Sequence, residues 1–269
     1  MEKGKLYNLR IIKSGDRIEI YKINNYVVGP KKKDNEVEIV NHDLESSQTR
    51  NTKSKDRERN LRDSRNNIIR LIKSNPDMKT FVALTFAEEK DYKTSKKCLN
   101  NCFNKLRRDY PGIKYLWVME YGDLKGRLHF HLLCNIKISI KLADTKEIKS
   151  LEHKELENNF NKRYWNYGYV FIRSLSQEEN TNIALYVSVY ITKSMDNKEL
   201  EGYRIYGYSH KTLNKPIEEK YYTTNNIDDI LSQYKEYRII YTNSYPIGYT
   251  DYRGEHEGNV SYFDLIKEK

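Results

Sequence analysis

The sequence predicts an α+β protein in which an antiparallel β-sheet is flanked by helices. Short runs of β-branched and aromatic residues alternate with segments whose apolar residues recur every three or four positions. Two pairs of strands are separated only by short turns, at Ser14-Gly15-Asp16 and at "DLKG" (123–126), as antiparallel hairpins require. From residue 55 the expected order is α-β-α-β-β-α-β-α, which suits helices packed on an antiparallel sheet.

The N-terminal part is expected to hold a hairpin, a linker and a basic helix. Residues 5–28 alternate apolar and polar side chains around the first turn, and residues 31–60 lose this period and are rich in charge. A helix is expected from about residue 55 to the stop signal Asn75-Pro76. Its arginines are either a solvated face or a surface that docks duplex DNA beside the cleaved strand.

The remaining elements follow from the same two periods. The expected strands are 80–86, 113–122, 127–136 and 167–175, and the expected helices are 94–109, 145–163 and 180–194. The tail from 195 to 269 is rich in tyrosine and has no clear period. We therefore divide the chain into an N-terminal hairpin and charged linker (1–54), a central domain (55–216) and a C-terminal extension (217–269).

Composition narrows the class of partner and the compartment. The 269 residues carry a net charge of +10, with a pI of about 9.2 and a mean hydropathy of -0.89, which favours a polyanionic partner, nucleic acid first. No apolar run is long enough to span a bilayer, and the N-terminus lacks the apolar core of a signal peptide. Three cysteines, an odd number without CxxC spacing, indicate reduced thiols in a cytoplasmic protein.

The stretch "GRLHFHLL" (126–133) carries two histidines that share one face of a strand. His129 and His131 point to the same side because side chains alternate along a strand, and Phe130 points to the other. An even-numbered loop places Glu120 directly across from His129. These three side chains would suit Mn²⁺, or Mg²⁺ as the alternative. The competing interpretation is a well-packed strand that happens to carry imidazoles.

A second group lies on the expected helix at 180–194. Tyr186, Tyr190 and Lys193 follow one another at spacings of four and three, so they share one helical face. Tyrosines at this spacing are often core residues. A phenol is also a nucleophile when a neighbouring cation favours the phenolate, and a metal ion beside it would polarise a phosphate.

Three motifs in order carry a resemblance to a known superfamily. "FVALTF" (81–86), "EYGDLKGRLHFHLL" (120–133) and "YVSVYITK" (186–193) resemble the three motifs of HUH endonucleases. The similarity extends over roughly residues 55–216. The chain looks like a rolling-circle replication initiator (Rep protein) of single-stranded DNA phages and plasmids, whose nuclease core has a ferredoxin-like sheet.

The resemblance implies a role for each motif residue. His129 and His131 would bind the divalent metal, with Glu120 as the third ligand. Tyr190 would be the first nucleophile, because it precedes x-x-Lys, and Lys193 would assist at the phosphate. Tyr186 matches the additional tyrosine of two-tyrosine members. Val189 replaces the basic residue common before the second tyrosine, so both a catalytic and a packing role stay open for Tyr186.

The implied reaction is metal-dependent nicking and rejoining of single-stranded origin DNA through a 5′-phosphotyrosyl link. No GxxxxGK[ST] motif occurs, so a separate helicase is the expected partner. Two rival functions stay open at this level. One is a non-catalytic nucleic-acid-binding module that stacks bases on a related sheet. The other is a transposase or relaxase of the same superfamily.

Overall fold

A computed structural model describes residues 6–24, 59–60, 62–122, 126–143, 147–175, 200, 202–251 and 254–268. The chain divides into two compact units. Lys53–Asn214 form what we call the central unit, and Met1–Thr52 together with Lys215–Lys269 form the terminal unit. Each unit contains a five-stranded antiparallel sheet, and helices accompany both sheets. The predicted α+β class is therefore confirmed.

The sheet of the central unit has the strand order β6-β3-β5-β4-β7. Every neighbouring pair is antiparallel. Its strands are β3 (Thr80–Phe86), β4 (Tyr115–Tyr121), β5 (Leu128–Cys134), β6 (Gly168–Ser174) and β7 (Tyr206–Tyr208). The first four coincide with the strands that the sequence predicted. β7 comes from the part of the sequence with no clear period, and it forms one edge of the sheet.

The helices of the central unit begin at side-chain caps. α2 (Tyr92–Asp109) starts after Asp91, whose carboxylate accepts the backbone N–H of Thr94 at 3.1 Å. α3 (Leu151–Phe160) starts after Ser150 and continues into the π-helical turn η1 (Asn161–Trp165). The predicted start at residue 145 was wrong for residues 147–150, which are not helical. The Ser150 hydroxyl, which accepts the N–H of His153 at 3.2 Å, sets the later start.

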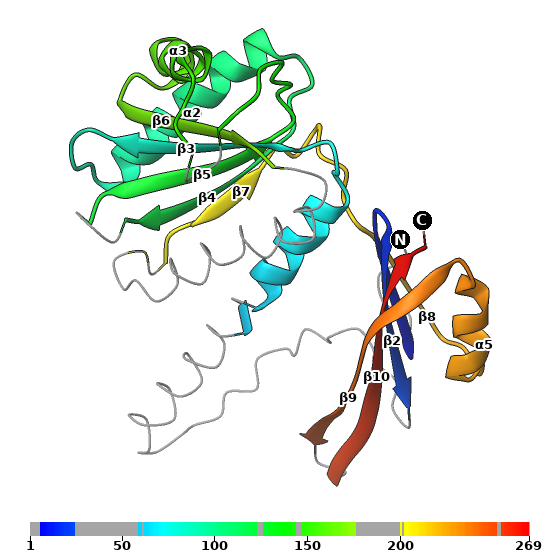
Figure 1. The fold of residues 1–269 in the computed structure, drawn as a ribbon. Helices are drawn as coiled ribbons and strands as arrows, with labels where there is room; N and C mark the ends of the chain where they lie inside the picture. Colours follow the sequence, from blue (N-terminus) through cyan, green and yellow to red (C-terminus); the bar gives the residue numbers. More distant parts are fainter. Residues whose placement is uncertain are drawn as a thin grey trace, which may run out of the picture. The chain divides into compact units, whose positions relative to one another are not determined.

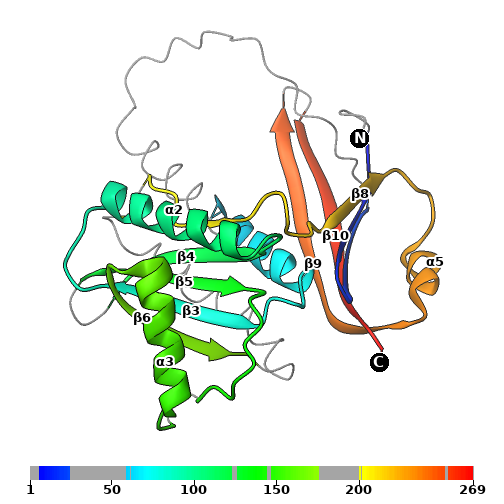
Figure 2. The ribbon, with the colours of Figure 1, turned by 90° about the horizontal axis from the view of Figure 1, so that it is seen from above.

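Both faces of the central sheet are covered, so its middle strands are apolar throughout. On one face, α2, α3 and η1 pack against Trp117, Phe130 and Leu132 (Figures 1 and 2). On the other face, the helix at 62–73 packs Ile68, Leu71 and Ile72 against the sheet, as the basic helix was predicted to do with its apolar side (Figure 1). This second face also carries the candidate site.

Asn75 fixes the end of the helix at 62–73. Its side chain is fully buried. Nδ2 donates to the carbonyl oxygens of Leu71 and Asn214, each at 2.8 Å, and Oδ1 accepts the N–H of Asn214 at 2.9 Å. The residue predicted as a helix stop thus also ties this helix to the last residue of the central unit. The predicted linker at 31–58 and the predicted helix at 180–194 lie outside the described residues.

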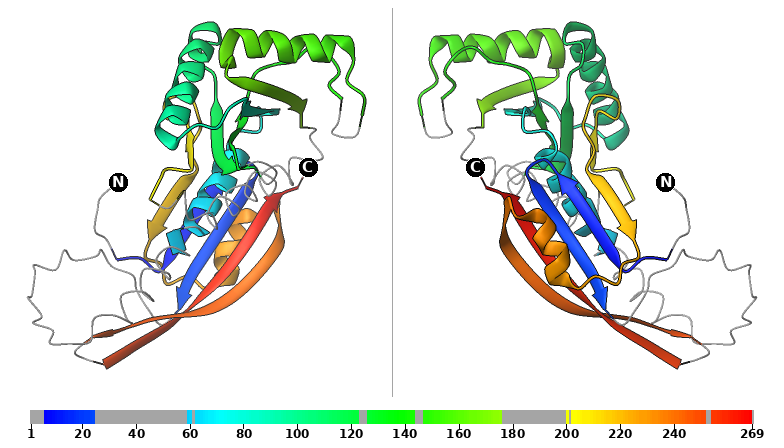
Figure 3. Two further views of the ribbon diagram at one scale, coloured as in Figure 1. Left: turned by 90° about the vertical axis from the view of Figure 1, so that its left-hand side faces the viewer. Right: turned by 90° about the vertical axis from the view of Figure 1, so that its right-hand side faces the viewer.

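The terminal unit is a sheet built from both ends of the chain. Its order is β8-β1-β2-β10-β9, from β1 (Leu9–Ser14), β2 (Arg17–Asn24), β8 (Ile217–Tyr221), β9 (Tyr237–Asp251) and β10 (Gly254–Lys267). The predicted first hairpin is confirmed, with Gly15 at φ 64° in its turn. α5 (Ile227–Leu231) and the short 3-10 turn η3 (Ser232–Tyr234) follow β8, and Ile230 of α5 covers one face (Figure 3). β9 and β10 are much longer than their neighbours.

Two features bear on the expectations from composition. None of the helices within the described ranges is both long enough and apolar enough to cross a bilayer. Cys98, Cys102 and Cys134 are free and buried, as expected for reduced thiols. Burial raises the pKa of the Cys102 and Cys134 thiols to about 12, so neither would act as a thiolate nucleophile near neutral pH.

Candidate metal site on the central sheet

The β4–β5 hairpin has the register that the sequence predicted. Glu120 pairs with His129 and Val118 pairs with His131. Because paired residues share a face and successive residues alternate, Glu120, His129 and His131 all lie on the face covered by the helix at 62–73. Phe130 lies on the opposite face, fully buried in the core beneath α2 and α3.

Glu120 and His131 form a buried pair. Nε2 of His131 and Oε1 of Glu120 are 2.7 Å apart, and each side chain is 9% exposed. The second carboxylate oxygen, Oε2, is also buried and makes no hydrogen bond within the part of the chain that the structure describes. A buried carboxylate oxygen without a partner is costly, and a bound cation is one way to offset that cost.

His129 lies on the same face but packs differently. It is half-buried, and its imidazole lies against Gly122 at the end of β4. A Cβ atom at Gly122 would be 2.6 Å from Cε1 of His129, so only glycine permits this approach. The hairpin holds Gly122 in place, since its N–H donates to the Arg127 carbonyl at 2.9 Å. Within the described ranges, no three His, Cys, Asp or Glu side chains are already gathered around one metal position.

The chemistry of these residues nevertheless fits a divalent metal. A carboxylate and two imidazoles are ligands for Mn²⁺ and related ions, and they leave coordination positions for phosphate oxygens. Two of the three side chains already meet, and the third stands directly across from Glu120 on the neighbouring strand. The described structure therefore accounts for how the hairpin would present all three ligands, with His129 turned away from Gly122.

The sequence alone did not reveal the neighbours of His131. Phe81 of β3 stacks on its imidazole with ring centroids 5.6 Å apart. The guanidinium of Arg173, from β6, lies 5.4 Å from the centre of the Phe81 ring. Directly across from His131 on β3 is Ala83, whose small side chain leaves the imidazole room. A pattern of alternation could have placed Phe81 and Arg173 on this face, had the strand order been known.

The predicted nucleophile residues cannot be placed next to this hairpin. Tyr186, Tyr190 and Lys193 lie outside the described residues, so their roles stay predictions.

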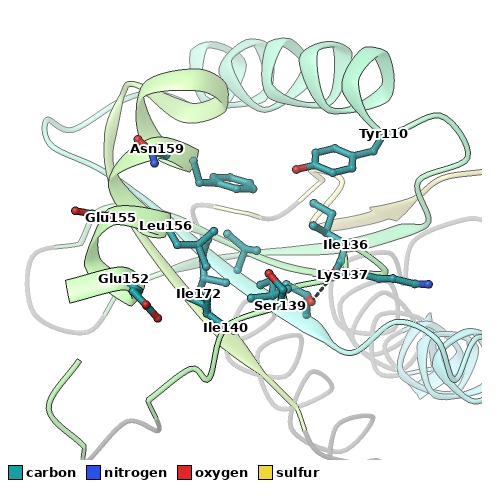
Figure 4. A pocket seen from close by; sticks show the side chains of 14 residues that line it. Tyr110, Ile136, Lys137, Ser139, Ile140, Glu152, Glu155, Leu156, Asn159 and Ile172 are labelled. Carbon is teal, nitrogen blue, oxygen red and sulfur yellow. Dashed lines mark hydrogen bonds between the residues drawn. The ribbon is translucent and has the colours of Figure 1, made fainter. Parts of the chain in front are cut away.

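A pocket beside α3 lies away from the hairpin. It has a volume of about 430 Å³ and is lined by Thr80, the segment 136–140 and the inner side of α3 (Figure 4). Thr80 is at the opposite end of β3 from Thr85, which pairs with His129. Its rim carries Glu152 and Glu155 but no histidine among the described residues. This pocket is therefore separate from the candidate metal site.

Comparisons with known proteins place the hairpin in a family context. The model of a family of replication-associated proteins, described by its member ORF2, matches residues 79–195, a range that includes the hairpin and the tyrosine motif. A Replication-associated protein ORF2 of Spiroplasma virus 4 is 27% identical over 217 residues, covering 74% of this chain. The match spans 65% of the length of that relative. No solved structure matches the chain. Over its central unit this chain is thus similar to phage replication-associated proteins, which confirms the resemblance that its three motifs predicted.

Proposed function

We propose that this protein initiates rolling-circle replication as an HUH endonuclease that nicks and rejoins one strand of origin DNA. The observation that carries the proposal is the buried Glu120–His131 pair with His129 across from it, inside the region similar to replication-associated proteins. The family match favours an initiator over a transposase or relaxase. Endonuclease chemistry distinguishes the proposal from a non-catalytic nucleic-acid-binding module.

Each residue of the hairpin has a defined task. Glu120, His131 and His129 would hold a divalent ion, Mn²⁺ or Mg²⁺, which when bound would polarise the scissile phosphate. Phe81 would keep the His131 ring in one orientation through stacking, and the nearby Arg173 guanidinium would add positive charge for the DNA phosphates. Burial of the Glu120–His131 pair strengthens its electrostatic effect, because water screens it little.

The proposed transfer conserves the energy of the phosphodiester bond. The Tyr190 oxygen attacks phosphorus, the bond from phosphorus to the 3′ oxygen breaks, and the tyrosine proton ends on that oxygen. A free 3′-OH and a 5′-phosphotyrosyl link result, with Lys193 favouring the phenolate. The 3′-OH can later attack the link and restore a closed strand. Tyr186 would make a second cut while the first 5′ end is held, and a separate helicase would unwind the duplex.

The test is a covalent adduct on single-stranded DNA. The full chain is incubated with Mn²⁺ and a library of random single-stranded oligonucleotides, and denaturing gels and peptide mass spectrometry locate the attached nucleotide. We expect an adduct on Tyr190 that Tyr190→Phe abolishes, since phenylalanine keeps the ring and removes only the nucleophilic oxygen. Tyr186→Phe is the matched control and should keep the first adduct but lose second-strand transfer. Reversible binding without any adduct would support the non-catalytic module instead.

A further inference from the structure

A second pocket, at the edge of the central sheet, carries positive charge. Its volume is about 480 Å³, within the range of small-ligand sites. Arg107 lines it from the last turn of α2, Tyr115 from the start of β4, and residues 208–212 from the segment that follows β7. Arg107, His210 and Lys211 are exposed, and no Asp or Glu is among the described residues around this pocket. An anionic ligand would therefore meet no repulsion.

Hydrogen bonds hold the wall of this pocket in one shape. The N–H of Ser209 donates to the Tyr115 carbonyl at 2.9 Å, and the N–H of Tyr115 donates to the Ser209 hydroxyl at 3.1 Å. The Thr212 hydroxyl donates to the carbonyl of Ile113 at 2.7 Å. Short chain segments fixed in this way present their side chains without a large loss of entropy on binding.

Arg107 is oriented but not saturated. Its Nη2 donates to the Tyr115 hydroxyl at 2.7 Å and its Nη1 donates to Asn104 at 2.9 Å. A guanidinium has five N–H donors in a planar fork, so several remain for phosphate oxygens. Lys211 adds a flexible ammonium on the opposite wall. Together the two side chains form a phosphate-binding pair.

The pocket also offers aromatic surface. The rings of Tyr208 and His210 have centroids 4.5 Å apart and planes tilted by 42°. Rings of this kind stack on nucleobases, and base–aromatic stacking tolerates any sequence. Inorganic phosphate alone would use neither ring and would fill little of the volume, so the combination fits a whole nucleotide better.

The pocket lies within reach of the hairpin. Tyr208 pairs with Leu116, four residues along β4 from Glu120, which is about 13 Å at roughly 3.3 Å per residue. A stacked strand covers this distance with about four nucleotides, at about 3.4 Å each. Leu116 and Val118 are buried between these points, so a strand would follow the edge formed by β7.

We propose that this pocket binds one nucleotide of the single DNA strand, a few nucleotides from the scissile phosphate. Arg107 and Lys211 contact its phosphate, and the Tyr208–His210 pair stacks on its base. The pocket would thus set how the strand is positioned before it is cut. This inference rests on the proposed function for its substrate, but its test needs no cleavage.

The first experiment measures DNA binding without a metal ion. Fluorescence anisotropy with a short labelled oligothymidylate in chelator compares the full chain with Arg107→Gln/Lys211→Gln. We expect about a tenfold loss of affinity and a salt slope that is shallower by about 1.4, since each phosphate contact on a single strand contributes about 0.7. Lys93→Gln/Lys97→Gln removes two exposed charges from α2 outside the pocket and should change affinity less than about twofold. Equal losses in both pairs would mean diffuse attraction and overturn the proposal.

The second experiment uses the unaltered protein, so it does not depend on how the variants fold. An oligonucleotide carrying iododeoxyuridine is photo-crosslinked, and the attached peptide is identified by mass spectrometry. Crosslinks at Tyr208 or His210 support the pocket, and crosslinks confined to other segments overturn it. Wild-type binding by the double variant together with normal adduct formation would refute the pocket alone. Absence of adduct with a crosslink at Tyr208 would refute the nicking proposal and leave the pocket standing.

Discussion

Gly122 is the residue at which the candidate site is most open to a small, interpretable change. In Gly122→Ala, the new Cβ would lie 2.6 Å from Cε1 and 2.9 Å from Nε2 of His129. Ordinary contact begins at 3.4 Å, so the imidazole must move by about 0.8 Å. Because Gly122 does not have a positive φ, the alanine adds no backbone strain of its own. The variant therefore displaces one side chain and leaves the fold intact.

The expected effect is large on chemistry and small on stability. A misplacement of about 1 Å in a catalytic group can reduce a rate about 100-fold. We expect Gly122→Ala to reduce the initial rate of adduct formation by about this factor, and to weaken Mn²⁺ binding measured by electron paramagnetic resonance. The midpoint of urea unfolding should change little, since the half-buried ring can move toward solvent.

Two controls separate this account from a general loss of structure. Gly202→Ala places an alanine at φ 79° in open space, so it adds about 1–2 kcal/mol of strain away from the hairpin and should leave nicking unchanged. The double variant Gly122→Ala/His129→Ala should be no slower than His129→Ala, because both changes act through one side chain. Additive losses, or normal Mn²⁺ binding by Gly122→Ala, would refute the reasoning.

Three further predictions concern charge, packing and the metal. Burial lowers the pKa of Lys96 from 10.5 to about 8, so the unfolded state binds more protons between these values and stability should rise with pH there; Lys96→Met should flatten this rise and add about 1 kcal/mol at neutral pH after screening, and an unchanged slope in urea unfolding would contradict this. Asn75→Ala leaves buried backbone groups unpaired and should cost about 3 kcal/mol in urea unfolding, whereas the exposed Asn100→Ala should cost less than about 0.5 kcal/mol. Mn²⁺ should raise the thermal midpoint of the wild-type protein and not that of Glu120→Gln, with the exposed Glu152→Gln as a control that keeps the response.

Local signals in the sequence were sufficient for the hairpin that carries the candidate site. A short turn and the alternation of side chains fix the Glu120–His129 register, because a slip of one residue would move every side chain to the other face. The orientation of the His129 ring could not be predicted, since it depends on the close approach of Gly122. The start of α3 was missed because the capping hydroxyl of Ser150 outweighs the helical pattern before it.

Contacts between distant segments account for the rest of what could not be predicted. Phe81 and Arg173 are brought together only by the pairing of β3 with β6, and their separation along the chain leaves no periodic signal. The terminal sheet has the same origin, because Leu9 of β1 pairs with Tyr221 of β8. Strand order within a sheet is a property of the whole chain, whereas apolar periodicity reports only on neighbours.

The terminal unit, built from both ends of the chain, has a consequence for synthesis on the ribosome. β1 and β2 emerge first, but their partners β8 and β10 are translated only after the whole central unit. Until then the first hairpin keeps two unpaired edges, and an isolated hairpin is at best marginally stable in water. The central unit, which contains all the partners of its own sheet, can fold first. We expect nascent chains stalled before β8 to show protease resistance in the central unit while the first hairpin is still cleaved.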